Sequence, residues 1–227
     1  MSRGVFDPRY EDLPARIPVF PLTGALLLPG GQMPLNIFEP RYLSMIDHAL
    51  SHDRIIGMIQ PAHAGKEGHE HESIDDGAAP LYSVGCAGRI TTFGETDDGR
   101  YVISLKGLVR FEVSSEKLTE EGFRVIEADF SSFRADMLEE GEDDKNLDRD
   151  RLLSVLSGYF EAQNIQADWD AIKQTETHRL VNSLAMICPF SPVEKQAILE
   201  APNLNMRADV MEVIMEMALH QGSGKSS

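Results

Sequence analysis

The sequence predicts an α+β fold, in which a β-rich N-terminal part is followed by an α-helical bundle. Three observations support this prediction. Between residues 16 and 135, prolines and glycines divide the apolar residues into short runs that are typical of strands. After residue 150, apolar residues recur at the three- and four-residue spacing of helices. The segment 137–150 between them is charged and poor in apolar side chains, which predicts a linker.

Strands are expected where β-branched, aliphatic and aromatic residues lie between turn residues. The expected strands are residues 16–20, 33–38, 54–60 and 122–130, and a hairpin is expected around the turn Asp97-Asp98-Gly99. The prolines in the first two strands suit sheet edges or bulges. One helix is expected among the strands. It has Pro40 in its first turn and an apolar face formed by Tyr42, Met45, Ile46 and Ala49.

Three apolar faces predict the helices of the bundle. They consist of Leu152, Val155, Leu156, Tyr159 and Phe160; of Ile172, Leu180, Leu184 and Ile187; and of Val210, Val213, Ile214 and Met217. A further helix start is indicated by Ser191-Pro192-Val193-Glu194, which has the pattern of a capping box. The predicted organisation is a β-rich part at 14–136, a linker at 137–150, a bundle at 151–220 and a flexible tail at 221–227.

Charge and cysteine content exclude several classes of protein. With 37 acidic and 21 basic residues the net charge is −16, and there is no run of Lys or Arg. Binding to nucleic acid or to an anionic membrane surface is therefore not expected, because both need phosphates to be neutralised. Two distant cysteines make no disulfide framework, and no apolar stretch is long enough to span a membrane. We expect a cytoplasmic protein.

No catalytic, cofactor or metal site is predicted. The residues His63, His69 and His71 have the chemistry of metal ligands, but they lie in a segment without a geometry-fixing motif, which favours a solvated loop. Adjacent Ser51-His52-Asp53 are expected to cap a helix end, because the members of a catalytic triad meet in space and not by adjacency. The tail 222–227 lacks the first glycine of a phosphate-binding loop. Cys188 is expected to be a buried, inert thiol.

Several short motifs together resemble one protein family. They are Phe20-Pro21-Leu22, Pro29-Gly30, Pro34-Leu35 and Phe38-Glu39-Pro40-Arg41-Tyr42, followed by the stretches 84–90, 105–111 and 185–196. In order and spacing they resemble the N-terminal, substrate-binding domain of the Lon (La, peptidase S16) proteases, over about residues 14–219. A related domain occurs in cereblon, a substrate receptor for ubiquitination.

This resemblance implies a PUA-like, twisted β pseudo-barrel followed by a helical bundle, and a domain that engages unfolded or tagged polypeptides. The Walker motifs and the Ser-Lys dyad segment of complete Lon proteases are absent from the sequence, so a non-catalytic binding module without cofactors is expected. Two alternatives stay open. The chain is an adaptor or regulator that docks on a separate AAA+ protease, or it is a hydrolase with an unrecognised site. The sequence leaves the oligomeric state open.

Six residues form the predicted binding site for a polypeptide or partner: Leu26, Leu27, Leu28, Phe38, Arg41 and Tyr42. Three consecutive apolar side chains on a strand cannot all face one core, so at least one leucine is expected to meet a groove, a partner or the second domain. On this view Leu27→Asp weakens client capture and leaves the fold intact. The structural interpretation of the second motif is that Phe38 ends a strand, Tyr42 packs, and Arg41 pairs with an acid of the second domain.

Overall fold

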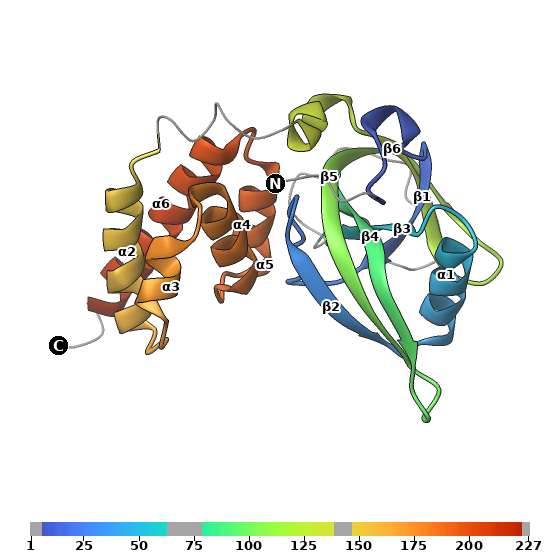
Figure 1. The fold of residues 1–227 in the computed structure, drawn as a ribbon, viewed down its shortest axis with the longest axis horizontal. Coiled ribbons are helices and arrows are strands. Elements are labelled where there is room, and N and C mark those ends of the chain that lie inside the picture. The colour runs from blue at the N-terminus through green and yellow to red at the C-terminus, as the bar shows by residue number, and fades with distance from the viewer. Residues whose placement is uncertain (1–5, 63–78, 139–146, 224–227) are drawn as a thin grey trace. The chain divides into compact units, whose positions relative to one another are not determined.

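The protein is described from a computed structural model, which describes residues 6–62, 79–138 and 147–223. The chain divides into two compact units, Met1–Glu139 and Glu140–Ser227. The first contains a six-stranded sheet with one α-helix, and the second contains α-helices (Figure 1). The predicted α+β class is confirmed, whereas the domain limits of 14–136 and 151–220 stay predictions.

The first unit follows the predicted order of elements. Its strands are β1 (Arg16–Pro21), β2 (Gln32–Ile37), β3 (Ile55–Ile59), β4 (Val84–Glu95), β5 (Tyr101–Leu118) and β6 (Arg124–Asp129). Helix α1 (Pro40–Leu50) begins at Pro40, as predicted. Two 3₁₀ helices, η1 (Tyr10–Asp12) and η2 (Ser131–Met137), were not predicted, because such short elements leave no periodic apolar pattern in the sequence.

The long strand β5 closes the sheet into a pseudo-barrel. The strand order is β2-β5-β4-β3-β1-β6, and β5 also pairs with β6. The first part of β5, Tyr101–Lys106, lies beside β2, and its last part, Glu112–Leu118, lies beside β6. The strands β5, β4, β3, β1 and β6 therefore form a ring, and β2 extends from this ring as an edge strand (Figure 1). This is the twisted pseudo-barrel that the family resemblance implied.

Phe111 of β5 is fully buried and packs against β3 and β4 of the ring. A Cβ atom added at Gly57 of β3 would lie 2.9 Å from the Phe111 ring and 2.9 Å from Cγ1 of Val19. Glycine at this position therefore lets the ring approach the backbone of β3. Residues 17–20 of β1 and all of β3 form continuous apolar runs, because they are buried whichever face they point to.

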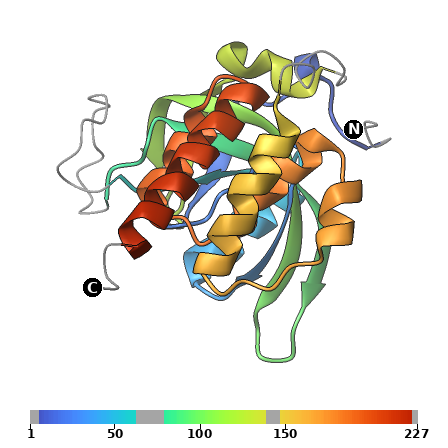
Figure 2. The same ribbon diagram turned by 90° about the vertical axis from the view of Figure 1, so that its left-hand side faces the viewer.

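The second unit consists of α2 (Arg149–Ala162), α3 (Trp169–Gln174), α4 (Thr177–Ile187), α5 (Pro192–Glu200) and α6 (Leu204–Ser223). Figure 2 shows α6, in red, alongside α2, in yellow. The predicted capping box at α5 is present: the Ser191 hydroxyl accepts from the Glu194 N–H, and the Glu194 carboxylate accepts from the Ser191 N–H. Helix α6 ends at Ser223, within the segment expected to be a flexible tail; residues 224–227 lie outside the described residues.

Two of the predicted helical faces need correction. The buried residues of α6 are Leu204, Arg207, Ala208, Met211, Glu212 and Met215, whereas the predicted Val213 and Met217 are exposed. Apolar residues surround most of this helix, so spacing alone does not select the buried face. Ile187, the last residue of α4, is exposed, and Ile172 belongs to α3 instead. The first predicted face is confirmed at Leu152, Leu156, Tyr159 and Phe160, which are buried on α2.

Candidate functional site

Strand β2 has a strand partner on one side only among the described residues. It pairs with β5 from Gln32↔Lys106 to Ile37↔Tyr101. No described strand lies on its other side, because β2 stands at the end of the strand order. An edge strand exposes backbone N–H and C=O groups, which can pair with another extended chain. We refer to the unpaired side of β2 as the β2 edge.

Two backbone observations show which residues of β2 direct their N–H and C=O groups toward the β2 edge. Pro34 has no N–H, and proline in a sheet is placed so that its nitrogen faces away from the ladder. On β5, the N–H and C=O of Gly107 both bond toward residues 30–31, so by alternation Leu105 and Ile103 also bond toward β2. Their partners are Met33 and Leu35, which leaves the backbone groups of Gln32, Pro34 and Asn36 facing the β2 edge.

The end of β2 lies beside the β4–β5 hairpin, which extends from the sheet (Figure 1), and this region carries exposed apolar residues. Phe38 directly follows β2 and is 62% exposed. Val102 of β5, opposite Asn36 of β2, is 47% exposed, and Phe93 of β4 is 40% exposed. The Phe93 ring packs edge-on against Tyr101, with 4.9 Å between centroids. Phe93 is the cross-strand partner of Ile103, so it points to the face opposite Val102. Phe38 and Val102 are therefore the exposed apolar side chains closest to β2, and such residues beside an unpaired strand are typical of interaction surfaces.

Of the predicted residues in the Phe38–Tyr42 motif, two are accessible. Phe38 is exposed, and Arg41 is exposed with its guanidinium 4.6 Å from the centroid of the Tyr42 ring. Tyr42 is buried edge-on against Phe20, with 4.4 Å between ring centroids, and burial raises the pKa of its hydroxyl. The expected pairing of Arg41 with an acid of the second domain stays a prediction. Arg41 pairs with Glu39, two positions away, at 2.9 Å, because both side chains leave the same first turn of α1.

The reasoning that selected Leu26, Leu27 and Leu28 does not hold in the structure. The segment is irregular and not a strand, so strand alternation does not apply to it, and all three leucines are at most 2% exposed. The segment crosses closely over β5: a Cβ atom added at Gly107 would lie 2.1 Å from the Leu28 carbonyl oxygen. Leu27 also lies against Gly88 of β4, where an added Cβ would be 2.7 Å from its Cδ2.

We expect Leu27→Ala to lower the free energy of unfolding by about 2–5 kcal/mol, because it leaves a cavity over β4 and β5. Leu27→Asp is expected to cost at least as much, since it would bury an unpaired carboxylate. The fold is therefore not expected to survive Leu27→Asp intact. Urea denaturation followed by circular dichroism measures both variants. Leu138→Ala is the matched control, since Leu138 is exposed. A Leu27→Ala midpoint equal to that of Leu138→Ala would contradict the expectation.

Comparison with known proteins relates the chain to one family. The family described as "ATP-dependent protease La (LON) substrate-binding domain" matches residues 16–216, which is most of the chain. The chain belongs to this LON substrate-binding domain family. Lon protease 2 of Myxococcus xanthus is 27% identical over 214 residues, covering 91% of this chain and 24% of that protein. Lon protease of Anaeromyxobacter dehalogenans is 32% identical over 103 residues, covering 45% of this chain and 11% of that protein.

Solved structures of LON domains share the fold. The Lon N-terminal domain protein from Xanthomonas campestris has a TM-score of 0.57 and 22% identity, covering 87% of this chain and 97% of that one. The N-terminal domain of the Mycobacterium avium complex Lon protease has a TM-score of 0.53 and 16% identity, covering 93% of this chain and 100% of that one. The chain spans about a quarter of the length of the curated Lon proteases it matches.

The remaining candidate residues of this LON domain have local structural contacts. The Ser51 hydroxyl donates to the His48 carbonyl at 2.8 Å and lies 3.1 Å from Nδ1 of His52, at the end of α1. Cys188 is buried, and burial raises the pKa of its thiol to about 12, so the thiol is protonated at neutral pH. His63, His69 and His71 lie outside the described residues, and within those residues no group of three His, Cys, Asp or Glu is placed to hold a metal.

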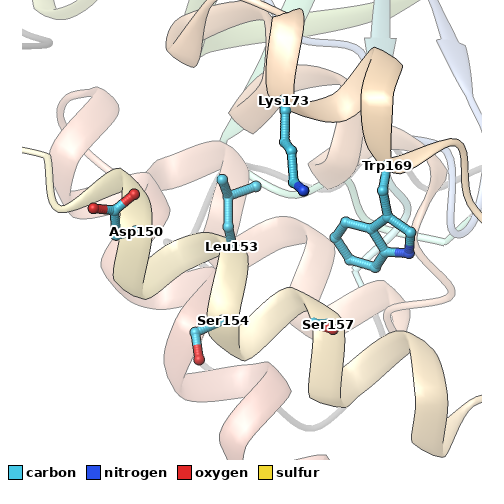
Figure 3. A pocket seen from close by; sticks show the side chains of 6 residues that line it. All are labelled: Asp150, Leu153, Ser154, Ser157, Trp169 and Lys173. Carbon is cyan, nitrogen blue, oxygen red and sulfur yellow. The ribbon is translucent and has the colours of Figure 1, made fainter.

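The helical unit has a hollow between α2 and α3 with a volume of about 400 Å³. It is lined by Asp150, Leu153, Ser154, Ser157, Trp169 and Lys173. Figure 3 shows Lys173 and Trp169 of α3 facing Leu153 of α2. Its two serines, its aspartate and its lysine are all exposed, whereas binding pockets for small molecules are usually lined by apolar side chains with a few buried polar groups. The β2 edge is therefore the stronger candidate site. Among the described residues no helix is long and apolar enough to cross a membrane.

Proposed function

We propose that this LON domain is a non-catalytic module that captures an extended polypeptide at the β2 edge. The observation that carries the proposal is the unpaired side of β2, with exposed Phe38 at its end. A client strand would pair with the outward backbone groups of Gln32, Pro34 and Asn36, which supplies affinity that does not depend on sequence. Its side chains would meet Val102 on one face of the sheet and Phe38 at the end of the strand. The membership of a substrate-binding domain family supports this function.

Asn36→Pro tests the proposal. The substitution removes an outward N–H and places a ring where the client backbone would lie, and it leaves the ladder to β5 untouched. We expect it to weaken binding of a permanently unfolded client, reduced and carboxymethylated α-lactalbumin, by about 10-fold, as one lost backbone hydrogen bond with a steric clash would. Fluorescence anisotropy with the labelled client measures the affinity.

Asn36→Ala is the matched control, because it keeps the N–H, and it is expected to bind like the unmodified chain. Circular dichroism checks that each variant is folded. Phe38→Ser removes the exposed ring at the end of β2 and leaves the strand itself unchanged. It is also expected to weaken binding of the client. A folded Asn36→Pro variant that binds as tightly as Asn36→Ala would overturn strand addition as the binding mode.

A second candidate function is that of an adaptor for a separate AAA+ protease. The observation that favours it is on α6, where Val213 and Met217 lie one turn apart and are both exposed. Val213→Ser together with Met217→Ser would then abolish co-purification with such a protease and leave client binding at the β2 edge unchanged. Loss of client binding in this variant, with co-purification retained, would contradict the adaptor function.

A further inference from the structure

Two cations lie side by side on the sheet next to β2. Arg89 of β4 and Lys106 of β5 are direct cross-strand partners, and Lys106 is also opposite Gln32 of β2. Cross-strand partners point to the same face of a sheet. Arg89, Lys106 and Gln32 therefore form one row across three strands, on the face opposite the buried Leu105, and this row ends at the β2 edge.

Asp7 binds both cations. Its Oδ1 accepts from Arg89 at 3.1 Å from Nε and 3.0 Å from a terminal nitrogen, and its Oδ2 lies 2.6 Å from Nζ of Lys106. The Asp7 side chain is 5% exposed, whereas those of Arg89 and Lys106 are 17% and 20% exposed. Asp7 precedes β1 in a segment whose described residues form no strand. Among the described residues, neither cation has another carboxylate partner.

Each oxygen of Asp7 contacts a different cation, Oδ1 contacting Arg89 and Oδ2 contacting Lys106. One contact can therefore break while the other is kept. If Lys106 turned away toward β2, two nitrogens of Arg89 would still contact Oδ1 of Asp7, so the buried carboxylate would keep a cationic partner. The Lys106 ammonium is a point charge on a flexible stem, and such a group exchanges between acceptors more readily than a guanidinium. Lys106 is therefore the member of the pair that can serve a second carboxylate.

We propose that Lys106 selects clients with an acidic side chain in the row of Gln32, and that Asp7 competes with the client for it. The inference rests on the proposed strand addition at the β2 edge. A strand added there lies two strand spacings from β5, about 10 Å. Extended lysine and glutamate side chains together span this distance on one face of the sheet. The net charge of −16 repels acidic clients over long distances, but at 0.1 M salt that repulsion is screened beyond about 10 Å. The choice is thus made locally by Lys106.

A pair of peptides tests this proposal. One is a blocked peptide of alternating valine and threonine with a central glutamate, and the other has glutamine in its place. We expect the unmodified chain to bind the glutamate peptide about 3-fold more tightly, as a partly exposed ion pair would allow. Lys106→Gln is expected to remove this preference. Asp7→Asn is expected to raise it to about 10-fold, because the competing carboxylate is gone while the shape is kept.

Lys117→Gln is the matched control, because Lys117 lies on β5 outside the part that pairs with β2, and it is expected to keep the preference. A preference that persists in Lys106→Gln overturns the inference, and Lys106→Gln decides the matter alone if Asp7→Asn does not fold. Equal binding of both peptides by the unmodified chain also overturns it, while strand addition stands. Two outcomes count against the proposed function itself. One is that neither peptide binds, and the other is that Asn36→Pro binds the peptides as tightly as the unmodified chain does.

Discussion

Replacing Asp136 with alanine is expected to lower the free energy of unfolding of the first unit by about 3–5 kcal/mol. Arg110 of β5 is 2% exposed and donates to Asp136 of η2 at 2.8 Å from Nε and 2.8 Å from a terminal nitrogen. The same carboxylate accepts the Arg110 backbone N–H at 3.0 Å. Without Asp136, the guanidinium loses its carboxylate partner in the interior, next to the Phe133 ring. Urea denaturation followed by circular dichroism measures the loss.

An exposed ion pair of the same unit provides the control. Arg134 also belongs to η2 and lies 3.3 Å from Glu11, but these side chains are 61% and 67% exposed. Arg134→Ala is therefore expected to cost no more than about 1 kcal/mol. The single tryptophan, Trp169, lies on α3, so its fluorescence reports the helical unit in the same experiment. Equal costs for Asp136→Ala and Arg134→Ala would show that burial does not set the strength of the Arg110 pair.

Local elements of this LON domain can be predicted from its sequence, because each has a signal within a few residues. The turn Asp97–Gly99, the proline at the start of α1 and the capping box at Ser191 are all of this kind. Closure of the barrel is different. It depends on β5 changing partner from β2 to β6 between Lys106 and Glu112, and nothing local encodes which strands lie beside each other. The family resemblance, and not periodicity, supplied that part of the prediction.

The residues selected from the sequence differ in their accessibility. Phe38 was selected from its motif and is exposed, whereas the leucine triplet was selected from an assumed strand and is buried. The edge position of β2 follows from strand order, so the sequence contains no direct signal for it. The exposed Val102 and Phe93 lie on the two arms of the predicted hairpin. Their closeness to its turn was the one sequence feature that could have indicated their exposure. The contacts of Asp7 join positions 82 and 99 residues apart, beyond the reach of any spacing argument.

Phe111→Ala is expected to lower the free energy of unfolding by about 3–5 kcal/mol, because it leaves a cavity where the ring packs against β3 and β4. The Phe111 ring is fully buried, and it packs edge-on against Phe130 with 6.4 Å between centroids. It lies close to the β3 backbone at Gly57, so no neighbouring side chain from that position can move in to fill the space. Thermal and urea denaturation followed by circular dichroism measure the effect.

A double-mutant cycle with Gly57 identifies the packing as the cause. Gly57→Ala alone is expected to cost about 1–3 kcal/mol, because its Cβ would lie 2.9 Å from the Phe111 ring and from Cγ1 of Val19. In the Phe111→Ala background the ring is absent, and the added methyl occupies part of the cavity, so the two losses should not add. The double variant is expected to be about as stable as Phe111→Ala alone. Strict additivity would mean that Gly57 is required for a reason other than the ring, such as its contact with Val19.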